Sequence, residues 1–347
     1  MQKKCRLISI IGFALAFILT SLVTENGKAQ TKEDSQGNQK VIKVRLSYDY
    51  LDTLHPARFN RRIAKRIEEE SNGRVKFEIY PSAMLFKSPE AIEAIQRGNL
   101  EMSAIVNSYF MALTPKVGIF ELPFAFPERK LLYESIDGEI AAKAFAPLED
   151  KNMKIIGAMD YSYIDITNSK KQIRSINDLK GLKIRAYSAI LGDTLTALGA
   201  SPMFIPGIEV PTALQQKVVD GACSGPDSFV YQKYFEFQKY LTISEHVHCL
   251  IDLVVSKKWW DGLPDDIRSL MERIIKEELI KQRSVAIEEE KQNIQTLKEK
   301  GMDVYVIPKE ERKVWKQATQ SVWDKHKEDI GAELVDQLIE LNKKYGY

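Results

Sequence analysis

The sequence has few of the side chains that build metal centres and catalytic sites. Its 347 residues include three cysteines and four histidines. Two of the histidines, His246 and His248, would share one face of a strand, but two ligands are too few for a structural zinc site. The sequence also lacks a Gly-x-Ser-x-Gly turn, a phosphate-binding glycine loop and a zinc-binding helix motif. We therefore expect a protein that is not an enzyme and that uses neither a cofactor nor a metal.

The chain also lacks a strong excess of charge of either sign. Its formal net charge is +2. Residues 1–29 carry four basic residues and one acidic residue, so the remainder is close to neutral. This balance gives no indication of nucleic acid or an anionic membrane surface as a partner.

Long apolar runs are absent beyond the amino terminus. Three basic residues precede a run from Leu7 to Val23, and Gly27 and Ala29 supply small residues at the usual cleavage spacing. This pattern predicts a signal peptide over residues 1–29, cleaved near Ala29, and a periplasmic protein. The run is longer than the usual signal core of ~7–15 residues, so an uncleaved anchor is the alternative. Residues 30–40 are polar and predict a disordered leader.

After cleavage near Ala29, two cysteines remain, Cys223 and Cys249. A disulfide between them is compatible with an oxidising compartment. Two buried free thiols are equally compatible, because the two residues fall on different predicted elements.

Short apolar strands alternate with helices through the first half of the chain. Period-two patterns predict strands at 41–48, 75–80 and 102–106, and helices at about 57–71 and 89–98 lie between them. Further strands are predicted at 181–185, 239–243, 250–256 and 304–307, with closing helices over 309–345. This alternation predicts an α/β fold with a mostly parallel, covered sheet.

A long helix is predicted from about Asp265 to Lys300. Apolar residues recur there at helical spacing, and Gly301 ends the pattern. At ~1.5 Å per residue the helix is about 50 Å long, which is enough to span two lobes. A dimerising coiled coil is the weaker alternative, because strict heptads are not sustained. We expect a monomer.

A basic residue lies at the end of the predicted strand 181–185. Leu182 and Ile184 alternate with Lys183 and Arg185. Ligands of open α/β sheets bind at the carboxyl ends of strands, and a guanidinium presents a rigid fork of donors to a carboxylate. From position alone, a surface arginine in an ion pair is the simpler interpretation.

Residues 178–185 read Asp-Leu-Lys-Gly-Leu-Lys-Ile-Arg. Four short segments follow by residue 221, in the order Gly-Ala, Glu-Val, Ala-Leu-Gln and Val-Val-Asp-Gly. This course resembles the solute-binding proteins of tripartite ATP-independent periplasmic (TRAP) transporters, and the resemblance extends over nearly the whole mature chain. It implies that Arg185 clamps a substrate carboxylate. It also implies a long helix that braces two lobes.

The resemblance implies a two-lobe periplasmic-binding-protein-like fold with mixed or parallel sheets. We predict that lobe I comprises residues 41–163 and 252–290, and lobe II residues 164–251 and 291–347. The implied function is capture of a small organic acid in the cleft, hinge closure, and delivery to the membrane subunits of a TRAP transporter. The alternative is a sensor that presents ligand to a membrane receptor or two-component system.

Predicted strand ends and the second-lobe crossing supply further candidates for substrate binding beside Arg185: Tyr50, His55, Asn107, Tyr109, Ser224 and Phe229. For each of these six, packing is an equally good interpretation.

The chain departs from the family pattern at two places. Tyr163-Ile164-Asp165 stands where many members have an additional arginine, and Cys223-Ser224-Gly225 stands where Glu-Asn-Pro is common. The first departure implies a substrate with less negative charge, a single carboxylate or a neighbouring cation.

Overall fold

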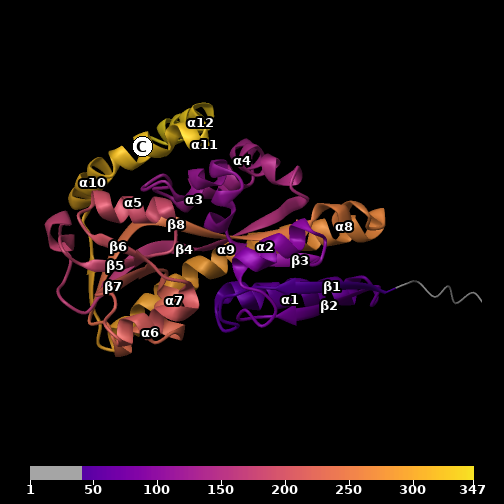
Figure 1. Ribbon diagram of the computed structural model, residues 1–347, viewed down its shortest axis with the longest axis horizontal. Helices are drawn as coiled ribbons and strands as arrows, with labels where there is room; N and C mark the ends of the chain where they lie inside the picture. Colours follow the sequence, from indigo (N-terminus) through magenta and orange to yellow (C-terminus); the bar gives the residue numbers. More distant parts are fainter. Residues whose placement is uncertain (1–40) are drawn as a thin grey trace, which may run out of the picture. The chain divides into compact units, whose positions relative to one another are not determined.

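Strands from both halves of the chain join one mixed sheet in the computed structural model, which describes residues 41–347 (Figure 1). The predicted signal peptide and leader, residues 1–40, lie outside the described residues. The order of the sheet is β2-β1-β3-β8-β4-β7-β5-β6, with β9 paired to β8. The strands are β1 (Ile42–Ser47), β2 (Val75–Tyr80), β3 (Met102–Val106), β4 (Met153–Asn168), β5 (Lys183–Ala186), β6 (Ser201–Phe204), β7 (Gly221–Ser224), β8 (Tyr240–Ser256) and β9 (Asp303–Val306).

Two long antiparallel strands, β4 and β8, connect the two ends of this sheet. The carboxyl-terminal part of β8 pairs with β3, while the carboxyl-terminal part of β4 pairs with β7. The β4–β8 register shifts at three places, between Ile155 and Gly157, Asp160 and Ser162, and Ile164 and Ile166. Such irregularities bend and twist a strand pair locally. The pair therefore runs through both halves of the fold.

The predicted α/β class is confirmed, with parallel β1–β2, β1–β3, β5–β6 and β5–β7 pairs beside antiparallel ones. One strand prediction was wrong in its extent. The separate strands expected at 239–243 and 250–256 form the single strand β8, because Val247 and His248 continue its pairing with β4 and are buried. The polar residues between the two apolar segments hid that continuity.

Helices flank the sheet, and the longest one is confirmed close to its predicted bounds. α9 contacts α1, α7 and β4. The helices are α1 (His55–Glu70), α2 (Ser88–Gln96), α3 (Arg129–Ile136), α4 (Glu139–Glu149), α5 (Ala189–Ala197), α6 (Val210–Gln215), α7 (Pro226–Tyr231), α8 (Lys257–Asp261), α9 (Asp265–Glu299), α10 (Lys309–Ala318), α11 (Gln320–Ile330) and α12 (Ala332–Lys344). No helix between residues 41 and 347 is long and apolar enough to cross a membrane.

The carboxyl-terminal helices lie along both halves of the fold. α11 packs on α5, while α12 packs on α3 and α4 (Figure 1). Lys40–Tyr347 form one compact unit, so the lobe boundaries given above stay a prediction.

Gly221 marks the tightest approach in the sheet. It opens β7, where it pairs with Asn168 of β4 and with Ile184 of β5. A Cβ atom at this position would lie 2.0 Å from the carbonyl oxygen of Thr167 and 2.8 Å from the Cβ of Asn168. A side chain here would therefore push β7 away from β4.

We expect Gly221→Ala to lower the free energy of unfolding by about 1–3 kcal/mol, the usual cost of overpacking. The measurement is urea denaturation, with Gly262→Ala as the matched control. A Cβ at Gly262 meets nothing closer than the Lys258 carbonyl oxygen at 3.3 Å. Equal losses in the two variants would contradict the argument.

Two acidic side chains, Glu121 and Asp252, are buried in the core. Burial raises the pKa of each to about 7, even though Asn107 Nδ2 donates a 2.6 Å hydrogen bond to Asp252 Oδ2. In the unfolded chain these groups titrate near 4. The folded state therefore holds protons that the unfolded state releases as the pH rises from about 4 to 7, and stability falls over that interval.

We expect Asp252→Asn and Glu121→Gln to remove this loss. Relative to the unmodified protein, each variant should gain on the order of 2 kcal/mol in the free energy of unfolding between pH 5 and pH 8. Urea denaturation at the two pH values measures it. Parallel pH dependence in all three proteins would show that the acids do not carry this effect.

Candidate functional site

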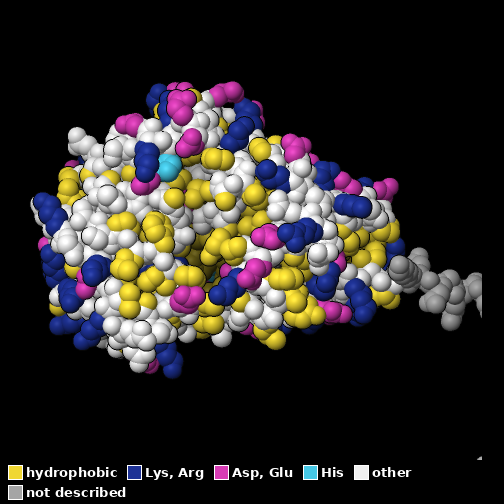
Figure 2. All heavy atoms as spheres, in the orientation of Figure 1, with side chains coloured by type: hydrophobic (Ala, Val, Ile, Leu, Met, Phe, Trp, Pro, Cys, Tyr) yellow, Lys and Arg dark blue, Asp and Glu magenta, His cyan; other side chains and the backbone are white. Residues whose placement is uncertain are grey.

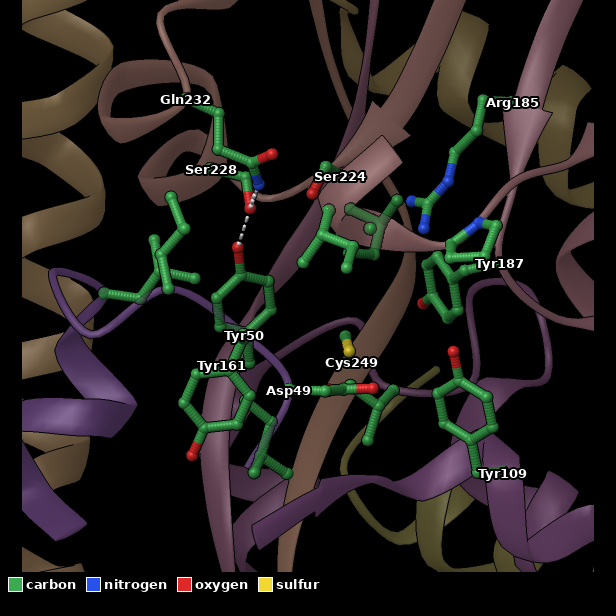
Figure 3. A pocket seen from close by; sticks show the side chains of 18 of the residues that line it. Asp49, Tyr50, Tyr109, Tyr161, Arg185, Tyr187, Ser224, Ser228, Gln232 and Cys249 are labelled. Carbon is green, nitrogen blue, oxygen red and sulfur yellow. Dashed lines mark hydrogen bonds between the residues drawn. The ribbon is translucent and has the colours of Figure 1, made fainter. Parts of the chain in front are cut away.

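A cavity of about 250 Å³ opens between the two ends of the sheet. Figure 2 shows a hollow on this face with hydrophobic side chains gathered around it. The walls come from the loop after β1, the end of β3, the middle of β4 and β8, the ends of β5 and β7, and α7 (Figure 3). The lining residues are Asp49, Tyr50, Leu51, Leu54, Lys87, Pro89, Val106, Tyr109, Tyr161, Ile164, Arg185, Tyr187, Pro206, Gly207, Ile208, Ser224, Ser228, Gln232, Tyr234, Cys249 and Ile251.

Arg185 enters this cavity from the end of β5, as predicted, although it is only 5 % exposed. Its Nε donates to the carbonyl oxygen of Ile205 at 2.8 Å, and its Nη1 donates to that of Cys223 at 2.9 Å. Its guanidinium lies 5.3 Å from the centre of the Tyr187 ring. Within residues 41–347, the structure pairs it with no carboxylate.

Those contacts leave the outer part of the Arg185 guanidinium, Nη2, facing the cavity (Figure 3). Gly207, another lining residue, lies beside it: a Cβ there would be 3.9 Å from Nη2, an ordinary van der Waals distance. A buried cation that is held by carbonyl oxygens and lacks an acidic partner electrostatically favours an anion beside it.

Three of the other predicted residues also line the cavity: Tyr50, Tyr109 and Ser224. Tyr50 follows β1 and stacks on Tyr48 with ring centres 4.7 Å apart. Tyr109 follows β3, and Ser224 ends β7. The structure thus brings these residues together with Arg185, although they are distant in the sequence.

The remaining three predicted residues, His55, Asn107 and Phe229, are not among the lining residues. His55 Nδ1 lies 3.2 Å from Asp227 Oδ2. Asn107 bonds Asp252, as described above. The ring centre of Phe229 lies 5.4 Å from that of Tyr234, a lining residue. All three are buried against other protein groups in this structure, and a direct contact with ligand stays a prediction.

Several lining residues were not among the predictions. Tyr161 and Ile164 come from β4, Cys249 and Ile251 from β8, and Tyr187 follows β5. The predicted residues lie mostly at strand ends, whereas β4 and β8 border the cavity with the middle of their length. The two-residue spacing of Cys249 and Ile251 places them on one face of β8 and could have identified that wall.

One cluster combines side chains that bind metals in other proteins. The ligand atoms of His55, Asp227 and Glu289 all lie within 4.8 Å of one another. Protein partners already occupy them, since both the backbone N–H and the ring of His55 contact Asp227, and Arg58 bonds Glu289. The cluster is therefore satisfied as a hydrogen-bonded ion pair network between α1, α7 and α9.

Electrostatics at this cluster favour a charged histidine. Burial alone lowers the pKa of His55, but the hydrogen bond and negative charge of Asp227 outweigh that effect, so the pKa is raised.

The two cysteines of the described residues, Cys223 and Cys249, are both free and buried, and burial raises the pKa of each thiol. Of the two alternatives for these cysteines, the structure shows free thiols.

Comparison with known proteins agrees with this architecture. Residues 54–329 match the family described as bacterial extracellular solute-binding protein, family 7. The C4-dicarboxylate-binding periplasmic protein DctP of Rhodobacter capsulatus is 32% identical over 271 residues, which is 77% of this chain and 81% of that protein.

Two solved structures are similar over most of the chain. The sugar acid binding protein of Advenella mimigardefordensis in complex with galactonate has a TM-score of 0.84 and 26% identity, covering 88% of this chain and 99% of that one. A TRAP periplasmic solute-binding protein of Sulfurospirillum deleyianum with bound succinate has a TM-score of 0.81 and 25% identity, covering 86% and 99%. On the strength of the matched residues 54–329, the chain belongs to the extracellular solute-binding protein family 7, whose relatives include the TRAP solute-binding proteins.

Proposed function

We propose that this protein captures a small organic acid in the cavity beside Arg185 and delivers it to the membrane subunits of a TRAP transporter. The observation that carries the proposal is the burial of Arg185 with carbonyl oxygens as its partners. Two of the relatives named above are described with bound succinate or galactonate, and both ligands are carboxylates.

The guanidinium supplies orientation as well as charge. Nε and Nη1 are fixed by two carbonyl oxygens, one directly after β6 and one within β7, so the remaining donors point in a set direction. A carboxylate that reaches them forms charge-assisted hydrogen bonds in a site from which most water is excluded. A cation fixed in advance also loses little side-chain entropy when the ligand binds.

Contacts between elements that follow strands at the two ends of the sheet suit a closed form. His55, at the start of α1, meets Asp227 of α7, and Arg58 bonds Glu289 of α9. Lys87 Nζ lies 4.0 Å from Glu209, beyond β6. We infer that ligand binding and these contacts stabilise the same closed arrangement, as expected when one ligand touches two bodies joined by a hinge.

Arg185→Ala should strongly weaken the binding of carboxylates. We expect the affinity for the best acid to fall roughly ten- to a hundredfold, because the lost hydrogen bonds involve two charged groups. Thermal shift against a panel of organic acids, sugar acids and amino acids identifies that acid first. A native-state ligand at a hundredfold excess over Kd adds ~2.7 kcal/mol of stability. Titration calorimetry then gives the two dissociation constants.

Arg185→Lys is the matched control for this variant. It keeps a positive charge but loses the planar fork, so its affinity should be intermediate. Equal affinity in Arg185→Ala and the unmodified protein, with the free energy of unfolding preserved, would remove Arg185 from the site.

Asp227→Asn should weaken ligand binding even though Asp227 does not line the cavity. It removes the charge that holds His55, and we expect about a tenfold loss of affinity with a more open ligand-bound form by small-angle X-ray scattering. Asp266→Asn, which breaks an ion pair with Arg74 away from the cavity, is the control. Identical affinities in both variants would show that the His55–Asp227 contact does not contribute to closure.

A further inference from the structure

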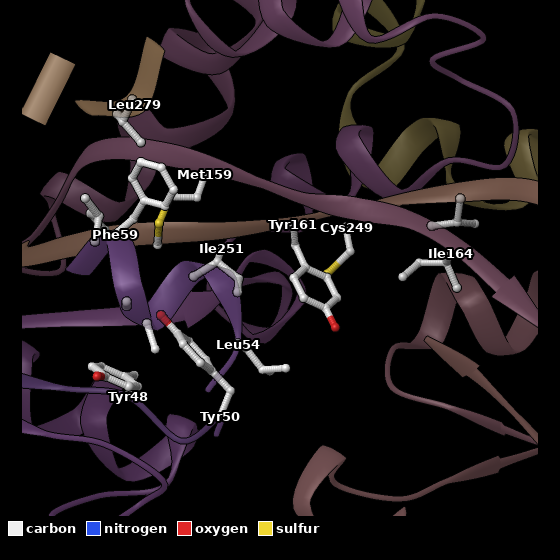
Figure 4. Close-up of a cluster of buried hydrophobic side chains, with 14 of the residues drawn as sticks. Tyr48, Tyr50, Leu54, Phe59, Met159, Tyr161, Ile164, Cys249, Ile251 and Leu279 are labelled. Atoms are coloured by element: carbon white, nitrogen blue, oxygen red, sulfur yellow. The ribbon is translucent and has the colours of Figure 1, made fainter. Parts of the chain in front are cut away.

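The walls of the cavity are continuous with the main hydrophobic core. Six lining residues are also members of the largest buried cluster, which Figure 4 shows in part. They are Tyr50, Leu54, Tyr161, Ile164, Cys249 and Ile251. A ligand in this cavity therefore rests on the same side chains that fill the interior of the fold.

The tyrosines in this wall turn their hydroxyl groups toward the protein. Tyr50 Oη accepts a 2.7 Å hydrogen bond from Asn60 Nδ2. Tyr161 Oη lies 2.6 Å from Ser228 Oγ (Figure 3). With these hydroxyls occupied, the two residues offer mainly ring surface to a ligand, and ring surface favours apolar and aromatic groups.

The two basic residues that line the cavity, Arg185 and Lys87, differ in how deeply they are buried. Arg185 is 5 % exposed, whereas the Lys87 side chain is 57 % exposed and lies near Glu209. Asp49 Oδ2 already accepts the backbone N–H of Ser88 at 3.0 Å. Arg185 is thus the one deeply buried cation among the lining residues of the described chain, and it can neutralise one carboxylate.

Ile164 makes part of the cavity wall formed by β4 apolar. It is 1 % exposed, lines the cavity and belongs to the core cluster. A second carboxylate or a row of hydroxyl groups placed against Ile164, Leu54 and Ile251 would lose its water without gaining hydrogen bonds. Burial of an unpaired polar group is unfavourable, and burial of an unpaired charged group is more so.

We propose that the ligand is a monocarboxylate whose remaining part is apolar, either an aromatic ring or a branched hydrocarbon chain. Its carboxylate meets Arg185, and its apolar part lies against Leu54, Tyr161, Ile164 and Ile251. This inference rests on the proposed function and narrows it, since dicarboxylates and sugar acids are excluded by the same wall that accepts a hydrocarbon.

A matched set of ligands tests the proposal by titration calorimetry on the mature protein. The first is 3-phenylpropionate, an apolar monocarboxylate. Benzylmalonate adds a second carboxylate to the same skeleton, and L-phenylalanine adds an amine that Asp49 would have to receive. Galactonate and succinate represent hydroxylated and short dicarboxylate ligands.

We expect 3-phenylpropionate to bind at least about tenfold more tightly than each of the other four, with a negative heat-capacity change from apolar burial. Tighter binding of succinate, galactonate or benzylmalonate that is lost in Arg185→Ala would overturn the proposal and leave the acid-binding function standing. Tighter binding of L-phenylalanine would overturn it in favour of a zwitterion. No Arg185-dependent binding of any acid would overturn the function and this inference together.

A pair of variants tests the wall itself. Ile164→Ala removes methyl and methylene groups from the cavity surface, and we expect about a tenfold weaker affinity for 3-phenylpropionate. The affinity for propionate, which ends near Arg185, should change less than twofold. Ile166→Ala is the matched control, because Ile166 is equally buried on β4 and does not line the cavity. Equal effects of the two variants on 3-phenylpropionate would show that Ile164 does not contact the ligand.

Discussion

The burial of one guanidinium without an acidic partner is the constraint on which the site depends. A charge removed from water costs several kcal/mol unless other groups compensate it. Here the carbonyl oxygens of Ile205 and Cys223 compensate in part, and the ring of Tyr187 adds a cation–π contact. The oxygen of Cys223 lies within β7 and that of Ile205 directly follows β6, and these two strands flank β5 in the sheet. The order of the strands therefore places the groups that hold Arg185 and leave its remaining donors available to an anion.

The β4–β8 pair gives the cavity its second property, an apolar wall. Both strands run between the two ends of the sheet. Core residues in the middle of each strand also line the cavity. Asp160 of β4 fixes this region: its carboxylate accepts from Arg129, and its backbone oxygen accepts from Gln282 of α9. Burial alone would raise the pKa of Asp160, but His248 and Arg129 hold it well below its usual value. A charged network on one side thus supports an apolar surface on the other.

Local patterns in the sequence predicted β1, β2, β3, β5 and β9, the long helix, and an arginine at the end of β5. Arg185 was accessible to such reasoning because its place at a strand end and its surrounding residues are both local features. Tyr50, Tyr109 and Ser224 lie at strand ends as well. His55 and Asn107 satisfied the same rule, but their partners, Asp227 and Asp252, are 172 and 145 residues away. A sequence cannot show which strand-end side chains are bound by groups so distant.

The same reasoning could not separate the core from the site, because Ile164, Cys249 and Ile251 belong to both. An apolar side chain at a buried strand position is normally interpreted as a core residue. Here each of the three side chains does pack in the core on one side. The other side borders an opening of about 250 Å³. A hydrocarbon that fills this opening would extend the contacts of the core at no cost in hydrogen bonds, whereas a polyol would bury hydroxyl groups that lose their bonds to water. Ligand selection and fold stability therefore share one surface, so substitutions in this wall that improve the affinity for polar acids should do so at the expense of packing in the core.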